Sequence, residues 1–165
     1  MIYMDLKEII QDEFYIKQAI LEAKIATNFD EVPVGAILVD QSGNEILRQH
    51  NKKESTFNAC AHAEILCLIE AGDKLKNWRL LNTTLYVTLE PCPMCFNALI
   101  QARVKKLVFG AYDPKGGSIS LGYHFQQDKR LNHQIQCVGG IEQYECGKLL
   151  SDFFKNKRSS YSSKS

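Results

Sequence analysis

Two short runs hold the residues best suited to chemistry, His62-Ala63-Glu64 and Pro91-Cys92-Pro93-Met94-Cys95. One histidine and two cysteines are ligand types that zinc prefers. Structural zinc sites are normally closed by four protein ligands, whereas catalytic sites hold three and leave one position for water. The count therefore predicts a catalytic zinc site with one Zn²⁺ per subunit, bound by His62, Cys92 and Cys95.

Glu64 stands two residues after the histidine and is predicted to act as a base. Zinc bound by two thiolates and a neutral histidine is formally neutral, so it should acidify water less than a site of three histidines. Glu64 would therefore serve as a proton shuttle from zinc-activated water to a ring nitrogen of the substrate. The H-x-E and P-C-x-x-C pair is the signature of zinc-dependent nucleobase deaminases. The expected reaction is the hydrolytic loss of an amino group.

Both halves of this motif stand where a helix is expected to begin. Cys92 and Cys95 are three residues apart, so one helical turn places their sulfur atoms on the same side. The dipole of a helix start and a bound cation both favour thiolate over thiol.

Bulk composition indicates one ordinary globular domain over residues 1–165. Hydrophobic residues make up 45% of the chain and charged residues 24%, which is enough for a core without disulfides. The first twelve residues do not resemble a secretory signal, and no apolar run reaches the ~20 residues that span a bilayer. We expect a cytoplasmic protein with reduced cysteines. Four of them are predicted to be buried: Cys60, Cys67, Cys137 and Cys146.

Hydrophobic spacing predicts helices and strands in alternation. The predicted helices cover residues 12–27, 61–71, 91–103 and 141–157, and the predicted strands cover 34–40, 45–49, 84–89, 106–109 and 134–138. Gly72 is predicted to end the second helix. Residues 1–11 and 159–165 are predicted to be flexible, and 111–132 to be irregular. This order indicates an α/β sandwich with helices on both faces of the sheet.

Further runs accompany the zinc motif. They are residues 31–36 (EVPVGA), 84–95 (TLYVTLEPCPMC), 108–111 (VFGA), 113–117 (DPKGG), 131–133 (LNH) and 150–154 (LSDFF). With them, the stretch from about residue 31 to 158 resembles the bacterial tRNA-specific adenosine deaminases, which convert the wobble adenosine of a transfer RNA to inosine. The zinc motif is shared across the cytidine-deaminase-like superfamily, whereas the later runs are similar to this narrower family.

The resemblance implies a three-layer α/β/α cytidine-deaminase-like sandwich with a mixed sheet of about five strands. It also implies a homodimer that acts on a tRNA anticodon loop, for which an arginine tRNA is the expected substrate. Asn51 matches the family asparagine that hydrogen-bonds the target base, although on its own it reads equally well as a turn residue. The other substrate contacts implied are Ala63, Asp113, Asn132 and Phe154.

The last predicted helix ends in basic residues. Lys155, Lys157 and Arg158 would attract RNA phosphates, and the alternative is a solvated, fraying C-terminus. Phe153 is predicted to join the core.

Residues 118–125 (SISLGYHF) depart from the family pattern, which usually has a small-residue turn and then a helix bearing leucine and methionine. Tyr123 and His124 in this segment are predicted to pack on the surface, with RNA contact as the alternative.

Three other functions compete with this one. A deaminase of a free base or nucleoside, such as guanine or cytosine, would use the same zinc chemistry. A non-catalytic RNA-binding zinc module could dispense with Glu64. A purely structural zinc domain would need a fourth ligand, and Cys60 is the local candidate.

Overall fold

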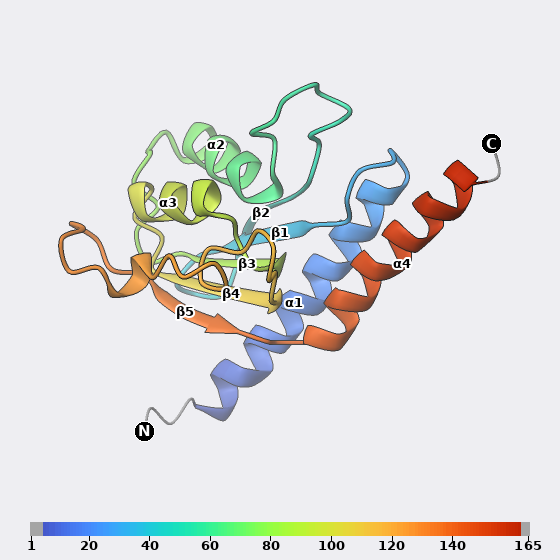
Figure 1. The fold of residues 1–165 in the computed structure, drawn as a ribbon. Helices are drawn as coiled ribbons and strands as arrows, with labels where there is room; N and C mark the ends of the chain where they lie inside the picture. The colour runs from blue at the N-terminus through green and yellow to red at the C-terminus, as the bar shows by residue number, and fades with distance from the viewer. Residues whose placement is uncertain (1–4, 163–165) are drawn as a thin grey trace.

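The computed structural model describes residues 5–162, with side chains described for 5–160 (Figure 1). Helices and strands follow in this order: α1 (Leu6–Thr27), β1 (Gly35–Val39), β2 (Glu45–His50), α2 (Ala63–Leu75), β3 (Thr84–Leu89), α3 (Pro93–Gln101), β4 (Lys106–Ala111), a 3-10 turn (Phe125–Gln127), β5 (Gln136–Gly139) and α4 (Gln143–Ser162). None of the helices among these residues has the length and apolar character needed to cross a membrane.

The five strands form one mixed sheet in the order β2-β1-β3-β4-β5. β1 pairs antiparallel with β2 and β3, whereas β3, β4 and β5 run parallel. Leu89 at the end of β3 lies opposite Ala111 at the end of β4. The two segments that leave these strands therefore begin at the same edge of the sheet, where open α/β sheets usually bind their ligands.

Helices cover both faces of this sheet, with α2 and α3 on one side and α1 and α4 on the other (Figure 1). Successive residues of a strand face opposite sides. Leu38 and Val87 accordingly pack in the cluster with Phe96 of α3, while Ile37 packs in the cluster with Ile16 of α1. The predicted three-layer sandwich is confirmed.

The first helix begins six residues earlier than predicted. Asp5 caps α1 by accepting a hydrogen bond from the amide of Lys7. The segment 6–11, which was predicted to be flexible, is therefore helical. The outward face of this helix carries apolar side chains, including Leu6 and Ile10, which are 68% and 58% exposed. They obscured the amphipathic pattern by which a surface helix is recognised.

Two helix ends also differ from prediction. Gly72 lies inside α2, because a single glycine costs a helix only about 1 kcal/mol. The helix ends instead at Leu75, and its C-cap residue Lys76 has a left-handed backbone with φ of 50°. α4 runs on to Ser162, so the predicted flexible end is helical over 159–162. Residues 1–4 and 163–165 of the predicted flexible ends lie outside the described residues.

The prediction of four buried cysteines is confirmed for Cys67 and Cys146. Cys137 is half-buried, and Cys60 is exposed, so that part of the prediction is wrong. The Asn58 side chain accepts a hydrogen bond from the amide of Cys60 and so fixes the turn that carries it. All six cysteines are free thiols.

A buried polar cluster joins α1 to the sheet. Asp12 is 1% exposed and accepts hydrogen bonds from the Tyr86 hydroxyl at 3.0 Å and from Lys106 Nζ at 2.8 Å. Burial and the Asp12 carboxylate raise the pKa of Tyr86, which keeps its hydroxyl protonated as a donor. The cluster fixes the helix against both β3 and β4.

Replacing the carboxylate at its centre should destabilise the fold. Asp12→Ala leaves a largely buried ammonium group and a buried hydroxyl without their acceptor, and should lower the free energy of unfolding by about 3 kcal/mol. Urea denaturation measures this change. Lys76→Ala is the control, because its ion pair with Asp73 is exposed and should contribute less than about 1 kcal/mol. Equal effects of the two substitutions would contradict the importance of the Asp12 cluster.

Candidate active site

The three predicted ligands come from two helix starts. His62 is the N-cap residue of α2 and Cys92 that of α3, while Cys95 lies in the first turn of α3. Neither N-cap side chain makes the usual capping hydrogen bond to its helix. Their donor atoms therefore remain available and converge, with His62 Nδ1 at 3.7 Å from Cys92 Sγ and 3.4 Å from Cys95 Sγ.

These separations fit a zinc ion. Tetrahedral zinc with ordinary Zn–N and Zn–S bonds holds nitrogen and sulfur ligands about 3.6 Å apart. The ligand atoms of His62, Cys92 and Cys95 all lie within 4.8 Å of one another. Cys60, the candidate fourth ligand, is exposed and outside this cluster. Among residues 5–160 the arrangement is thus that of a three-ligand site, the number that catalytic zinc uses.

The two thiols differ in their readiness to ionise. Hydrogen bonds from Cys95 and His62 lower the pKa of Cys92 to about 4. The pKa of Cys95 is raised, because its thiol is the donor in that pair and is also buried. Cys92 is consequently the thiolate of the pair before any cation adds its own attraction.

A pocket of about 280 Å³ opens onto the ligand cluster. It brings together the predicted zinc ligands His62 and Cys92, the predicted base Glu64, and three of the five predicted substrate residues. The lining residues are Val32, Val34, Asn51, Lys53, His62, Ala63, Glu64, Leu89, Glu90, Cys92, Asp113 and Gly116.

Glu64 is the second residue of α2 and is only 4% exposed. Burial raises the pKa of its carboxyl to about 7. Because Glu64 follows the ligand His62 by two residues and lines the same pocket, it is placed to exchange protons with a molecule bound there.

Asn51 has part of its amide group free. Its Nδ2 donates to the carbonyl of Val32 at 3.2 Å, and its Oδ1 accepts from the amide of Lys53 at 3.1 Å. An asparagine amide has two N–H donors and an oxygen with two lone pairs. One donor and one acceptor site therefore remain for a ligand in the pocket.

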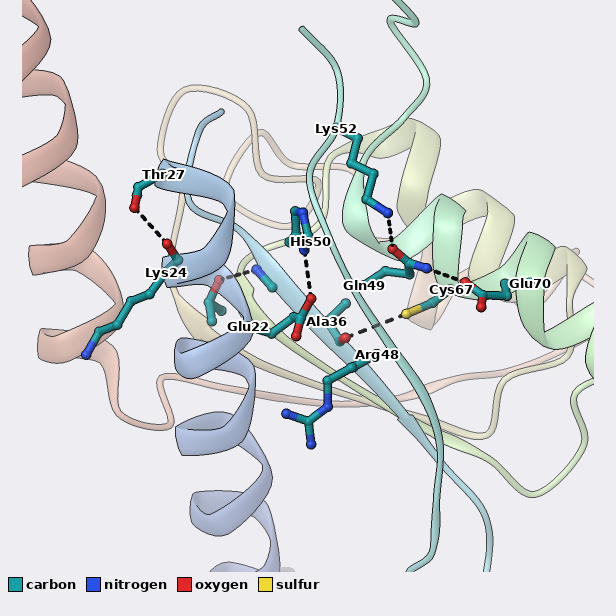
Figure 2. Close-up of polar contacts among 12 residues, drawn as sticks. Glu22, Lys24, Thr27, Ala36, Arg48, Gln49, His50, Lys52, Cys67 and Glu70 are labelled. Atoms are coloured by element: carbon teal, nitrogen blue, oxygen red, sulfur yellow. Dashed lines mark hydrogen bonds and ion pairs between the residues drawn. The ribbon is translucent and has the colours of Figure 1, made fainter. Parts of the chain in front are cut away.

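The end of β2 is attached to helices on both sides, which fixes the residue that follows it (Figure 2). Glu22 of α1 accepts a hydrogen bond from His50 Nδ1 at 2.7 Å. Glu70 of α2 accepts another from the Gln49 side chain, which in turn accepts from Lys52 Nζ. Asn51 comes directly after this attached strand end, so its position is set by α1 and α2 together.

The remaining predicted RNA contacts lie outside the pocket. Asn132 is exposed, and Phe154 is 43% exposed on α4. Lys155 and Arg158 are exposed on the same helix, whereas Lys157 pairs with Asp30 at 3.2 Å.

Two further predictions concern whether Phe153, and the pair Tyr123 and His124, are buried or exposed. Phe153 is half-buried and packs edge-on against Phe154 instead of entering the core, so that prediction is wrong. Tyr123 and His124 are exposed, as surface residues would be.

One residue of the site was missed in the sequence. Glu90 lines the pocket, is 2% exposed, and accepts hydrogen bonds from the backbone of Asp113 and Ser120. The signal was a carboxylate at the end of a buried strand, two residues before Cys92. Its partners lie 23 and 30 residues further along the chain, which no local pattern reveals.

Comparison with known proteins agrees with this geometry. A family model described as the cytidine and deoxycytidylate deaminase zinc-binding region matches residues 9–111. The tRNA-specific adenosine deaminase of Bacillus subtilis (strain 168) is 51% identical over 148 residues, which are 90% of this chain and 91% of that protein.

Solved structures show the same relationship. One from a study of A-to-I editing by tRNA:A34 deaminases at the wobble position of transfer RNA has a TM-score of 0.78 and 38% identity, covering 83% of this chain and 99% of that chain. A guanine deaminase from Nitrosomonas europaea has a TM-score of 0.72 and 25% identity, covering 86% of this chain and 83% of that chain. The chain therefore belongs to the zinc-binding cytidine and deoxycytidylate deaminase family, and within it to the tRNA-specific adenosine deaminases.

Proposed function

We propose that this protein deaminates the wobble adenosine of a tRNA anticodon to inosine. The observation that carries the proposal is the pocket in which a three-ligand zinc site, a buried glutamate and a half-free asparagine amide meet. Its volume of about 280 Å³ lies below the range for drug-sized ligands, so it suits a single base. A base in an anticodon loop is poorly stacked, and flipping it into the pocket costs only a few kcal/mol.

Each group has a distinct task in this reaction. When bound by His62, Cys92 and Cys95, zinc supplies Lewis-acid activation of a water molecule. Glu64 would accept one proton from the attacking water and deliver it to a ring nitrogen of adenine; it would then take the second proton of that water from the new C6 hydroxyl and pass it to the departing amino group. A bond forms between C6 and the water oxygen, the C6–N bond breaks, and ammonia leaves. Asn51 orients the base with its free donor and acceptor.

Two observations favour an RNA substrate over a free base. The identity to the Bacillus subtilis tRNA-specific deaminase is 51%, against 25% to the guanine deaminase structure. In addition, Lys155 and Arg158 lie exposed on α4, where they would attract phosphates. Lys157 is less available for that task because it already pairs with Asp30.

The finer features of the assignment are also proposals. They are that the protein is a homodimer, that it works in the cytoplasm and that its substrate is an arginine tRNA. Asp113 lies at the pocket and would meet the anticodon loop there. Asn132 and Phe154 would do so on the surface outside it.

The function is tested by incubating the zinc-loaded protein with an arginine tRNA that carries adenine at the wobble position. Sequencing should read that position as guanine, because inosine pairs with cytosine. Free guanine and cytosine are offered in parallel, with ammonia release as the readout. Ammonia from a free base, together with no inosine in the tRNA, would favour the rival deaminase.

Removing the proton shuttle should stop the reaction without releasing the metal. Glu64→Gln keeps the shape of the side chain but cannot accept the proton, so kcat should fall by about 10³-fold. Metal analysis should still find one zinc per subunit. A variant that retains more than a tenth of the wild-type kcat would rule out Glu64 as the proton shuttle.

Removing a ligand should release the metal. Cys92→Ser is expected to lose zinc and inosine formation together, and treating the wild type with a chelator should have the same effect until zinc is restored. Cys60→Ser is the matched control, because that thiol is exposed and outside the ligand cluster. Zinc loss in Cys60→Ser would instead point to a four-ligand structural site.

A further inference from the structure

Glu90 holds the segment that forms one wall of the pocket. Its Oε2 accepts hydrogen bonds from the amide of Asp113 at 2.9 Å and from the Ser120 hydroxyl at 2.5 Å. Its Oε1 accepts from the amide of Ser120 at 2.8 Å. One buried carboxylate thus holds both ends of the segment 113–120, of which Asp113 and Gly116 line the pocket.

The backbone at Gly117 is shaped around this carboxylate. A Cβ atom at that position would lie 2.3 Å from Glu90 Cδ and 2.4 Å from its Oε2. At this distance a Cβ would force the Glu90 carboxylate to move away and give up hydrogen bonds to the segment, so glycine at 117 allows the close approach. The close approach and the three hydrogen bonds together define one position for the wall.

The wall is also attached directly to the zinc-ligand segment. The amide of Ser118 donates to the carbonyl of Pro91 at 2.8 Å, and Pro91 lies between Glu90 and Cys92. On the other side of the ligands, Phe96 follows Cys95 and packs against Phe125 at a centroid distance of 6.0 Å. Residues 118–125, which depart from the family pattern, therefore contact the ligand segment before Cys92 and after Cys95.

We propose that Glu90 is a positioning residue for the substrate, which sets the distance between the Asp113–Gly116 wall and the zinc ligands, with Ser120 completing its hydrogen bonds. The inference rests on the proposed function, because the molecule positioned is the flipped base. Glu90 has a structural and not a proton-transfer role in this scheme, since three donors of the segment 113–120 already bind its two oxygens. A misplaced wall should weaken binding of the base and leave zinc binding unchanged.

Glu31, next to the pocket residue Val32, offers a matched comparison. It is fully buried and accepts hydrogen bonds from the amides of Ser55 at 2.6 Å and Glu54 at 3.1 Å. Burial alone would raise the pKa of Glu31, but these two amides lower it. It therefore holds the segment after Asn51 in the way that Glu90 holds the segment after β4, and the two anchors can be removed separately.

The first test measures anchoring without activity. In Glu90→Gln the amide group of the new side chain faces donors that the carboxylate accepted, so hydrogen exchange at the amides of Asp113 and Ser120 should accelerate by about 10-fold or more. In Glu31→Gln the acceleration should appear at Glu54 and Ser55 instead. Unchanged exchange at Asp113 and Ser120 in Glu90→Gln would overturn the proposal, whether or not the protein acts on tRNA.

The second test uses inosine formation in an anticodon stem-loop. Glu90→Gln should lower kcat/KM by about 100-fold, mainly through a higher KM, because displacing a substrate by about 1 Å has an effect of this size. Zinc should remain at one ion per subunit. A fall in kcat/KM of less than threefold, or a fall matched by zinc loss, would overturn the proposal.

Ser120 supplies a milder pair of variants if Glu90→Gln folds poorly. Ser120→Ala removes one hydrogen bond to a carboxylate and should lower kcat/KM about 10-fold. Ser120→Thr retains the hydroxyl and should restore kcat/KM to within about twofold of wild type. Equal activity of the alanine and threonine variants would show that the hydroxyl does not act through Glu90. Failure of the wild type to form inosine would be a failure of the proposed function, and the exchange test would still decide the anchoring.

Discussion

β3 and β4 run parallel with Leu89 opposite Ala111, and this pairing determines where the chemistry can take place. The chain leaves β3 toward Cys92 and leaves β4 toward Asp113, so a metal ligand and a pocket wall start from adjacent points on one sheet edge. α2 and α3 then begin near that edge, and their first residues supply His62, Glu64 and Cys95. The site is thus assembled from the beginnings of two helices and the ends of β2, β3 and β4.

Buried carboxylates bind the backbone amides of loops near the pocket, which the helices and strands leave without hydrogen-bond partners. A loop beside a pocket has backbone amides that no strand or helix satisfies, and an unpaired buried amide is costly. Glu31 and Glu90 each accept two such amides and so convert irregular segments into fixed walls. Preorganised walls favour catalysis, because the substrate does not have to order them when it binds. The pocket therefore has acidic residues of two kinds. Glu64 lines the pocket and has a raised pKa, whereas Glu90 accepts hydrogen bonds from the backbone amides of the pocket wall.

The cluster of His62, Cys92 and Cys95 and the position of Glu64 beside it were predictable from the sequence because they depend on local spacing. A spacing of three positions from Cys92 to Cys95 means about one helical turn wherever the helix lies, and Glu64 follows His62 within the same turn. The sheet and its layers were also predictable, since the buried strands stand out. The role of Glu90 was not predictable, because its hydrogen-bond partner Ser120 lies 30 residues further along the chain and comes back to the end of β3 only in the folded protein. The exposure of Cys60 and the early start of α1 were missed for a related reason: hydrophobic character alone does not say which side of an element faces solvent.

The space beside Gly117 has a consequence for how this chain can change over evolutionary time. A methyl group there would lie 2.3 Å from the Glu90 carboxyl carbon, so the two positions are coupled although they are 27 residues apart in the sequence. A larger residue at 117 would displace the Glu90 carboxylate, and a smaller residue at 90 would leave the amides of Asp113 and Ser120 without their acceptor. A protein with only one of the two substitutions would have a poorly anchored segment 113–120. Positions 90 and 117 should accordingly vary together or not at all among relatives. Position 115 should vary independently of them, because the Lys115 side chain is exposed on the same turn.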